Sequence, residues 1–186
     1  MTRVIAGAAG GRRLAVPPSG TRPTSDRARE GLFSTLQALA GPLDGLRVAD
    51  LYAGSGAVGL EALSRGAVGV VLVESAPRAV AVVRANAASL GLPGAEVLAL
   101  PVERAAAAPP PGGPVDVAFL DPPYALEASA LAAVLADLAA SGWFAPEAVV
   151  AVERATRGGA FPWPAGFAAL RERAYGEATI WYAAAP

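Results

Sequence analysis

The sequence contains no cysteine, no histidine and no lysine among its 186 residues. Without cysteine it has no disulfide, no thiolate nucleophile and no cysteine-based metal site. Without histidine it cannot use Ser-His-Asp or Cys-His catalysis, and most zinc sites are excluded. Because lysine is absent, all 15 basic residues are arginine. Any chemistry must therefore use carboxylates, arginine, tyrosine, hydroxyls, backbone groups or a reactive cofactor, and we expect no metal.

Long apolar runs are also lacking. Glu127 and Asp137 flank and interrupt the most alanine-rich region, so no segment reaches the length of a membrane span. The apolar core of residues 1–13 is too short for a secretory signal. A hydrophobic content of 54% and a charged content of 17% are typical of a compact globular protein. We therefore expect a cytoplasmic protein without membrane contact.

Charge is distributed unevenly along the chain. Residues 1–30 hold six arginines and two acids, whereas residues 31–186 hold nine arginines and fourteen acids. A basic N-terminal segment on an acidic body favours contact with a polyanion, and a solvated basic tail is the alternative. The arginines expected to make this contact are Arg3, Arg12, Arg13, Arg22 and Arg27.

The hydrophobic pattern predicts an α/β fold. Short β-type runs at 3–7 and 12–16 predict a hairpin, and Thr24 or Ser25 is expected to cap a helix. Two strand-like halves within 169–183 predict a terminal antiparallel hairpin. Between these two hairpins, strands alternate with helices, which is typical of a parallel, doubly wound sheet with helices on both faces. Strands are expected at 47–53, 69–74, 95–100, 115–121 and 147–153, and helices at 57–66, 77–90, 127–140 and briefly within 103–108. We expect two parts, an arm with its loop at 1–23 and a larger domain at 24–186.

A glycine-rich loop follows the first strand of this alternation. Residues 50–59 read DLYAGSGAVG, in which GSGAVG fits G-x-G-x-x-G between a strand and a helix. Glycines there allow a tight turn and let backbone N–H groups approach a ligand. Glu74 ends the next strand, at the distance where an acid binds ribose hydroxyls. The pattern predicts a nucleotide-type cofactor, and glycines that serve only strand–helix packing are the alternative.

The charge beside this loop distinguishes between cofactors. Asp50 lies immediately before the loop, where it would repel the pyrophosphate of NAD. A cofactor with a cationic amino-acid tail and no phosphate would instead be attracted. S-adenosylmethionine has such a tail and a ribose suited to Glu74, so the charges favour it over NAD.

A second motif, FLDPPY at 119–124, closes another apolar strand. Pro122 and Pro123 lack an N–H and cannot extend a strand ladder. The Asp121 carboxylate and the Pro122 carbonyl can accept both N–H bonds of an amine, and Tyr124 offers a ring on which a flipped base can stack. We therefore predict a catalytic corner at these four residues, with a helix cap at Asp121 and a rim aromatic at Tyr124 as the alternatives.

These motifs together carry a family resemblance. The stretch DLYAGSGAVGLEALSRGA at 50–67, Glu74 and DPPY resemble an amino-directed Class I methyltransferase. With GTRPTSDRAREGLFSTL at 20–36 and RAYGEATIWY at 173–182, the chain resembles the RsmD family over nearly its full length. That family consists of bacterial 16S rRNA guanine-N2 methyltransferases, which act at position 966 in the usual rRNA numbering.

The resemblance implies a seven-stranded Rossmann-like methyltransferase fold with a β-hairpin arm, S-adenosylmethionine as cofactor, and 16S rRNA as substrate. We expect the rRNA to be bound within an assembling 30S subunit, with free rRNA as the alternative, and we expect a monomer because nothing in the sequence suggests an obligate dimer. The resemblance also implies that Asp121, Pro122 and Tyr124 contact the substrate, and adenine contacts are expected near 101–103. Three alternatives stay open: an adenine-N6 methyltransferase of DNA or RNA, a nicotinamide oxidoreductase, and a non-catalytic RNA-binding protein. The implied cofactor contacts are Asp50, Tyr52, Ala53, Gly54, Ser55, Gly56, Glu74 and Asp121.

Overall fold

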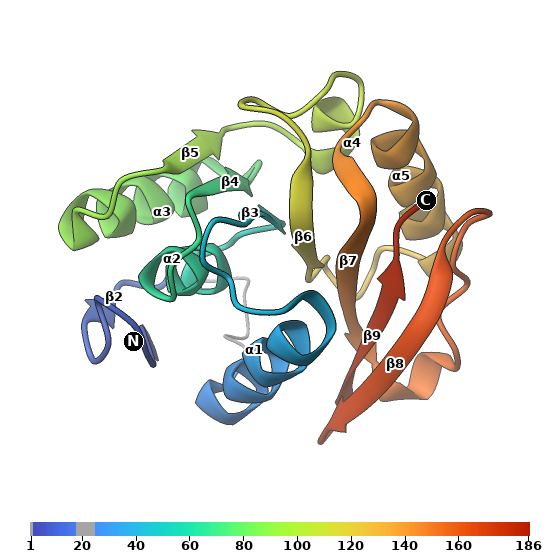
Figure 1. Ribbon diagram of the computed structural model, residues 1–186, viewed down its shortest axis with the longest axis horizontal. Coiled ribbons are helices and arrows are strands. Elements are labelled where there is room, and N and C mark those ends of the chain that lie inside the picture. The colour runs from blue at the N-terminus through green and yellow to red at the C-terminus, as the bar shows by residue number, and fades with distance from the viewer. Residues whose placement is uncertain (1, 18–24) are drawn as a thin grey trace.

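A seven-stranded sheet forms the centre of the protein, shown in Figure 1 as a computed structural model that describes residues 2–17 and 25–186. Its strand order is β5-β4-β3-β6-β7-β9-β8. The first five strands in this order are parallel, whereas β9 is antiparallel to both β7 and β8. This confirms the predicted α/β fold with its antiparallel C-terminal hairpin. The strands are β3 (Arg47–Leu51), β4 (Gly69–Val73), β5 (Ala95–Leu98), β6 (Val115–Leu120), β7 (Phe144–Ala155), β8 (Ala168–Tyr175) and β9 (Ala178–Ala184).

Helices cover both faces of this sheet. The first core cluster joins one face to α1, α2 and α3, and the second joins the other face to α4 and α5. Double coverage explains why β3, β4 and β6 are nearly continuous apolar runs. None of the helices in the described part of the chain has both the length and the hydropathy that crossing a membrane requires. The helices are α1 (Asp26–Ala40), α2 (Ala57–Ser64), α3 (Pro77–Leu90), α4 (Val102–Ala105), α5 (Ala128–Ala140) and the 3₁₀ helix η1 (Thr156–Gly158).

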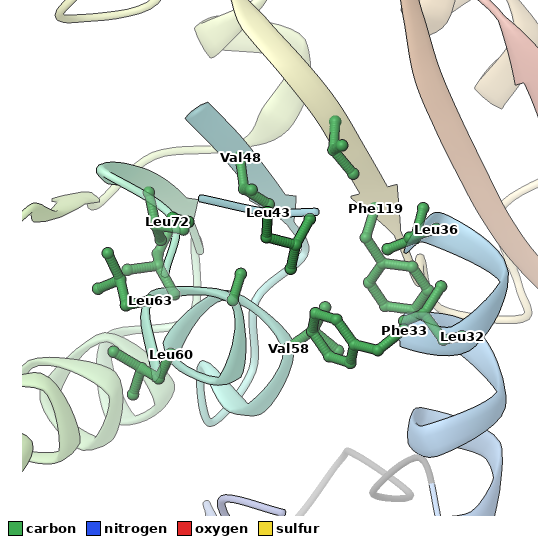
Figure 2. Packing of buried hydrophobic residues seen from close by; sticks show 14 of the residues in the cluster. Leu32, Phe33, Leu36, Leu43, Val48, Val58, Leu60, Leu63, Leu72 and Phe119 are labelled. Atoms are coloured by element: carbon green, nitrogen blue, oxygen red, sulfur yellow. The ribbon is translucent and has the colours of Figure 1, made fainter. Parts of the chain in front are cut away.

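Close packing on the first face positions the elements that carry the glycine loop. Figure 2 shows Leu32, Phe33 and Leu36 of α1 beside Phe119 of β6, at the helical spacing of the sequence. Beneath β3 and β4, α2 approaches so closely that a Cβ on Gly59 would lie 2.8 Å from Leu72 Cδ2. Glycine is therefore required at this position for α2 to reach the sheet.

The N-terminal hairpin is present but has shorter strands than predicted. β1 (Thr2–Arg3) and β2 (Arg13–Leu14) pair antiparallel over two residues each. The predicted runs at 3–7 and 12–16 are too long because Ile5 N–H turns away from the ladder and donates to Glu61 of α2. The division of the chain at residue 23 stays a prediction.

Strand β7 is longer than the predicted 147–153. Its carboxyl end continues past the last paired residue of β6 because it pairs there with β9, from Glu153 with Ile180 to Ala155 with Ala178. The extension carries two charged residues, Glu153 and Arg154, to the edge where β6 ends.

Candidate active site

Three carboxylates lie at the carboxyl ends of three adjacent strands. Asp50 is on β3, Asp121 directly follows β6, and Glu153 is near the end of β7. Leu120 pairs with Val152, so Asp121 and Glu153 lie at the same level of the sheet. Because side chains alternate along a strand, all three face α1 and α2. Each follows by two residues a member of the core cluster on that face, namely Val48, Phe119 and Ala151.

Asp50 is almost completely buried, at 2% exposure. Its Oδ2 accepts the N–H of Gly59 at 2.8 Å. The pKa of Asp50 is raised to about 7: burial raises it most, the Gly59 hydrogen bond lowers it, and the charge of Glu74 adds a smaller increase. A buried acid whose charged form is disfavoured is stabilised as a carboxylate when a cation binds beside it.

The pKa of Asp121 is also raised, and two neighbouring acids contribute to this rise where Asp50 has one. The pKa of Asp121 is raised to about 8, first by burial and then by the charges of Glu153 and Asp50, against the lowering effect of Arg154. The two motifs singled out in the sequence therefore interact electrostatically across β3 and β6. At neutral pH, without a bound cation, Asp121 favours its protonated form.

The glycine loop begins in a strained backbone conformation. Tyr52 has a φ of 69°, a left-handed conformation that costs a non-glycine residue roughly 1–2 kcal/mol. Gly54 and Gly56 follow with φ of 58° and 77°, and a Cβ on Gly56 would lie 2.5 Å from Val83 Cγ2. Tyr52 Oη lies 3.4 Å from Glu103 Oε1 of α4. The positive φ angles and the close approach of Gly56 to Val83 give the loop a tight turn between β3 and α2.

Glu74 holds this loop at the end of β4. Its Oε2 accepts the Gly54 N–H at 2.9 Å, and its Oε1 accepts the N–H groups of Ser75 and Ala76 at 2.8 Å each. A carboxylate has roughly four lone-pair sites, so three bonds leave about one for a ligand. The carboxylate position is thus fixed by the backbone.

Asn86 of α3 supports the same loop and was not found by sequence reasoning. Its side-chain amide donates to Ser55 O and to Ala15 O and accepts the Ala15 N–H, each at 2.9 Å. It therefore joins the glycine turn to the segment that follows β2. One indication was present in the sequence: Asn86 is a polar residue at a position that helical spacing places among apolar residues on the buried side of α3.

The DPPY motif forms an ordered turn after β6. Pro122 is buried, whereas Tyr124 is 57% exposed. The Leu126 N–H donates to Pro123 O at 2.9 Å and closes a four-residue turn that contains Tyr124. Glu153 and Arg154 lie beside this corner but were not predicted as site residues. In the sequence they follow the apolar residues of β7. They lie near Asp121 only because β6 and β7 are adjacent in the sheet.

The arginines expected to contact a polyanion differ in their surroundings. Arg3 Nε bonds to Asp26 Oδ2 at 3.0 Å, and Arg12 donates to the carbonyls of Ser89 and Leu90 at the end of α3. Arg13 and Arg27 are exposed. Arg22 lies outside the described residues, as does Thr24. Ser25 caps α1, since its Oγ accepts the Ala28 N–H at 3.2 Å.

The donor set fits a cationic nucleoside cofactor better than a metal. Buried Asp50 favours a positive group, the glycine turn leaves room for close approach, and Glu74 is fixed at the strand end. Within residues 2–17 and 25–186, no group of three or more acidic, histidine or cysteine residues is arranged to hold a metal ion.

Comparison with known proteins shows which proteins the whole chain resembles. The chain is 37% identical to Ribosomal RNA small subunit methyltransferase D of Escherichia coli K12 over 176 residues, which cover 94% of this chain and 85% of that protein. The solved structure of yhhF from Escherichia coli has a TM-score of 0.85 and 32% identity, covering 98% of this chain and 97% of that chain. A hypothetical protein of Thermus thermophilus has a TM-score of 0.78 and 38% identity, covering 98% of both chains.

Methyltransferase relatives that share this fold imply an S-adenosylmethionine-type cofactor. The family model described as Conserved hypothetical protein 95 matches residues 2–184, nearly the whole chain. The chain therefore belongs to the Conserved hypothetical protein 95 family, which is the RsmD family expected from its motifs.

Proposed function

We propose that this protein transfers a methyl group from S-adenosylmethionine to the exocyclic N2 amine of a guanine in 16S rRNA, at position 966 by family resemblance. The observation that carries the proposal is the placement of Asp50 and Asp121 at the carboxyl ends of the adjacent strands β3 and β6, where Leu51 pairs with Leu120. One carboxylate stands beside two rigid prolines, and the other stands beside a strained glycine turn. Together they provide one site for an amine and one for a cationic donor.

The residues of the glycine loop would hold the cofactor. Asp50 and Asp121 provide negative charge for its cationic groups, and the remaining acceptor site of Glu74 suits a ribose hydroxyl. Backbone groups of residues 52–56 line the turn, and Glu103 lies within 3.4 Å of the Tyr52 hydroxyl. When bound, S-adenosylmethionine supplies an electrophilic methyl group on a sulfonium.

The DPPY corner would orient the acceptor. The Asp121 carboxylate and the Pro122 carbonyl accept the two N–H bonds of the guanine amine, which directs the nitrogen lone pair toward the methyl group at about 3–3.5 Å. Pro122 and Pro123 restrict this corner. Tyr124 provides a ring for stacking the flipped base, worth roughly 1–3 kcal/mol.

Asp121 also offers an acceptor for the released proton. As the nitrogen–methyl bond forms and the sulfur–methyl bond breaks, the amine nitrogen must lose one proton. Burial and the acidic neighbours raise the pKa of Asp121 in the free protein to about 8, and once a bound cation has ionised it, its carboxylate is the group placed to take that proton. This explains how the chemistry proceeds without histidine.

The N-terminal arm would bind the RNA phosphates. Exposed Arg13 and Arg27 are the first residues expected to do so, joined by Arg3, Arg12 and Arg22. We propose that the protein acts as a monomer in the cytoplasm, on rRNA within an assembling 30S subunit.

The test is transfer of labelled methyl groups to free 16S rRNA, to 30S particles and to plasmid DNA, followed by digestion to nucleosides. We expect N2-methylguanosine as the product from the RNA-containing substrates and no methylation of the plasmid DNA. N6-methyladenosine as the sole product would support the adenine methyltransferase instead. Binding of NADH without binding of S-adenosylhomocysteine would support the oxidoreductase.

A further inference from the structure

Arg154 of β7 contacts both ends of the turn that carries Tyr124. Its Nη1 donates to Pro123 O at 3.4 Å, and its Nη2 donates to Leu126 O. Pro123 and Leu126 are also the residues joined by the backbone hydrogen bond that closes this turn. One guanidinium therefore holds the first and the last residue of a four-residue turn, from a neighbouring strand.

Pro122 and Pro123 have no N–H to donate, so backbone hydrogen bonds from these two residues cannot fix the turn. Arginine suits this task because its planar fork presents several donors in fixed directions, whereas lysine presents one compact ammonium. The contact thus depends on the shape of the side chain as well as on its charge.

The same guanidinium acts on the groups around the catalytic corner. Its positive charge lowers the pKa of Asp121 and opposes the effects of Glu153 and Asp50. It also lowers the pKa of Tyr52, which Glu103 raises. Arg154 directly follows Glu153 on β7 and bonds to Pro123, two residues after Asp121, so its guanidinium lies where the turn leaves the end of β6.

We propose that Arg154 is a positioning residue for the methyl transfer: it fixes the turn at 123–126 so that Tyr124 meets the base, and it keeps a positive charge beside Asp121. The inference rests on the proposed function, because the base and the amine are its substrates. Arg154 itself touches neither in this account. It acts through Tyr124 and Asp121.

Three variants separate shape from charge. Arg154→Gln removes both, Arg154→Lys keeps the charge but loses the fork, and Arg157→Gln removes an exposed arginine three residues further along as a matched control. Two measurements use the free protein: the rate of chymotrypsin cleavage after Tyr124, and the titration of Asp121 followed by carboxyl NMR. A third is the pH dependence of kcat/KM with rRNA.

We expect Arg154→Gln to be cleaved several-fold faster after Tyr124 than the natural protein. In this variant Asp121 should titrate at a higher pH, and the acid limb of the kcat/KM profile should also move to a higher pH. Arg154→Lys should be cleaved faster with its titration near that of the natural protein, and Arg157→Gln should change neither. If Arg154→Gln does not fold, Arg154→Lys still tests the turn.

Wild-type cleavage in both Arg154 variants would overturn the inference, as would an unchanged Asp121 titration in Arg154→Gln. If the natural protein methylates no nucleic acid, the proposed function fails. The cleavage and titration experiments would still decide whether Arg154 holds the turn, so the two failures are distinguishable.

Discussion

Two regions of the molecule bury carboxylates in opposite ways. Where the N-terminal arm meets α2, Glu61 is 0% exposed and is surrounded by donors. It accepts the N–H groups of Ile5 and Ala6 at 2.8 and 3.1 Å, forms an ion pair with Arg65 at 2.8 Å, and lies 3.8 Å from Arg29. At the carboxyl edge of the sheet, Asp121 instead has Asp50 and Glu153 as electrostatic neighbours, opposed by Arg154.

The difference separates an acid that stabilises the fold from one held for a ligand. The donors around Glu61 come from the chain itself, so its charge joins the arm to the domain. The acids around Asp121 destabilise its charge, and a cationic ligand would relieve that cost. Glu61 and Asp50 are buried and Asp121 is half-buried, and the sign of the neighbouring charges distinguishes the two sites.

The largest effect is expected from breaking the Glu61 site. Glu61→Ala leaves Arg29 buried with one fewer acid and two backbone N–H groups without their acceptor. Removing one partner of a buried pair costs about 3–5 kcal/mol, so we expect a loss of that size in the free energy of unfolding. Urea denaturation measures it, with exposed Glu30→Ala as the control, for which we expect a change within about 0.5 kcal/mol. An equally small change for Glu61→Ala would show that the arm is not anchored there.

The next effect is on turnover rather than stability. Asp121→Ala removes the acceptor for the amine N–H and for the released proton, so kcat should fall at least about 10²- to 10³-fold. Binding of S-adenosylhomocysteine, measured by calorimetry, should change little. Exposed Asp137→Ala on α5 is the control. Full turnover in Asp121→Ala would remove this residue from the mechanism.

A pH experiment sharpens the comparison. In the free protein the pKa values of Asp50 and Asp121 are raised to about 7 and about 8, so both acids are largely protonated at pH 6 and ionised at pH 9. The affinity for S-adenosylmethionine should therefore rise over this range, relative to the uncharged-sulfur analogue S-adenosylhomocysteine, by up to about tenfold for each unit of pKa that the sulfonium lowers. Calorimetry with both ligands gives the ratio. A ratio independent of pH would mean that these acids do not face the sulfonium.

The smallest effect is expected among the arginines of the N-terminal region. Arg13→Gln and Arg27→Gln should each reduce the slope of log affinity against log salt for rRNA by about 1, because each would lose one phosphate contact. Arg12→Gln should mainly lower the urea midpoint, since its guanidinium already binds the end of α3. An unchanged salt slope in both Arg13→Gln and Arg27→Gln would place the RNA elsewhere.

The sequence predicted the order of elements and the two motifs because these depend on local patterns. The sequence shows directly where apolar runs, helical spacing and turn glycines occur. It also shows that Asp50, Glu74 and Asp121 stand at strand ends, which made them candidate site residues. Glu153, Arg154 and Asn86 were missed because each acts on a segment distant in the chain. Asn86, for example, bonds to Ala15 and Ser55.

By itself, then, the sequence determined that carboxylates end three apolar strands and that no histidine is available for catalysis. Only the tertiary structure decided which charges meet. The crossover that places β6 between β3 and β7 brings Asp50, Asp121 and Glu153 to one edge, with Arg154 against the turn. The physical reason is that burial and neighbouring charge control an acid's pKa, and both depend on strand adjacency rather than on residue order.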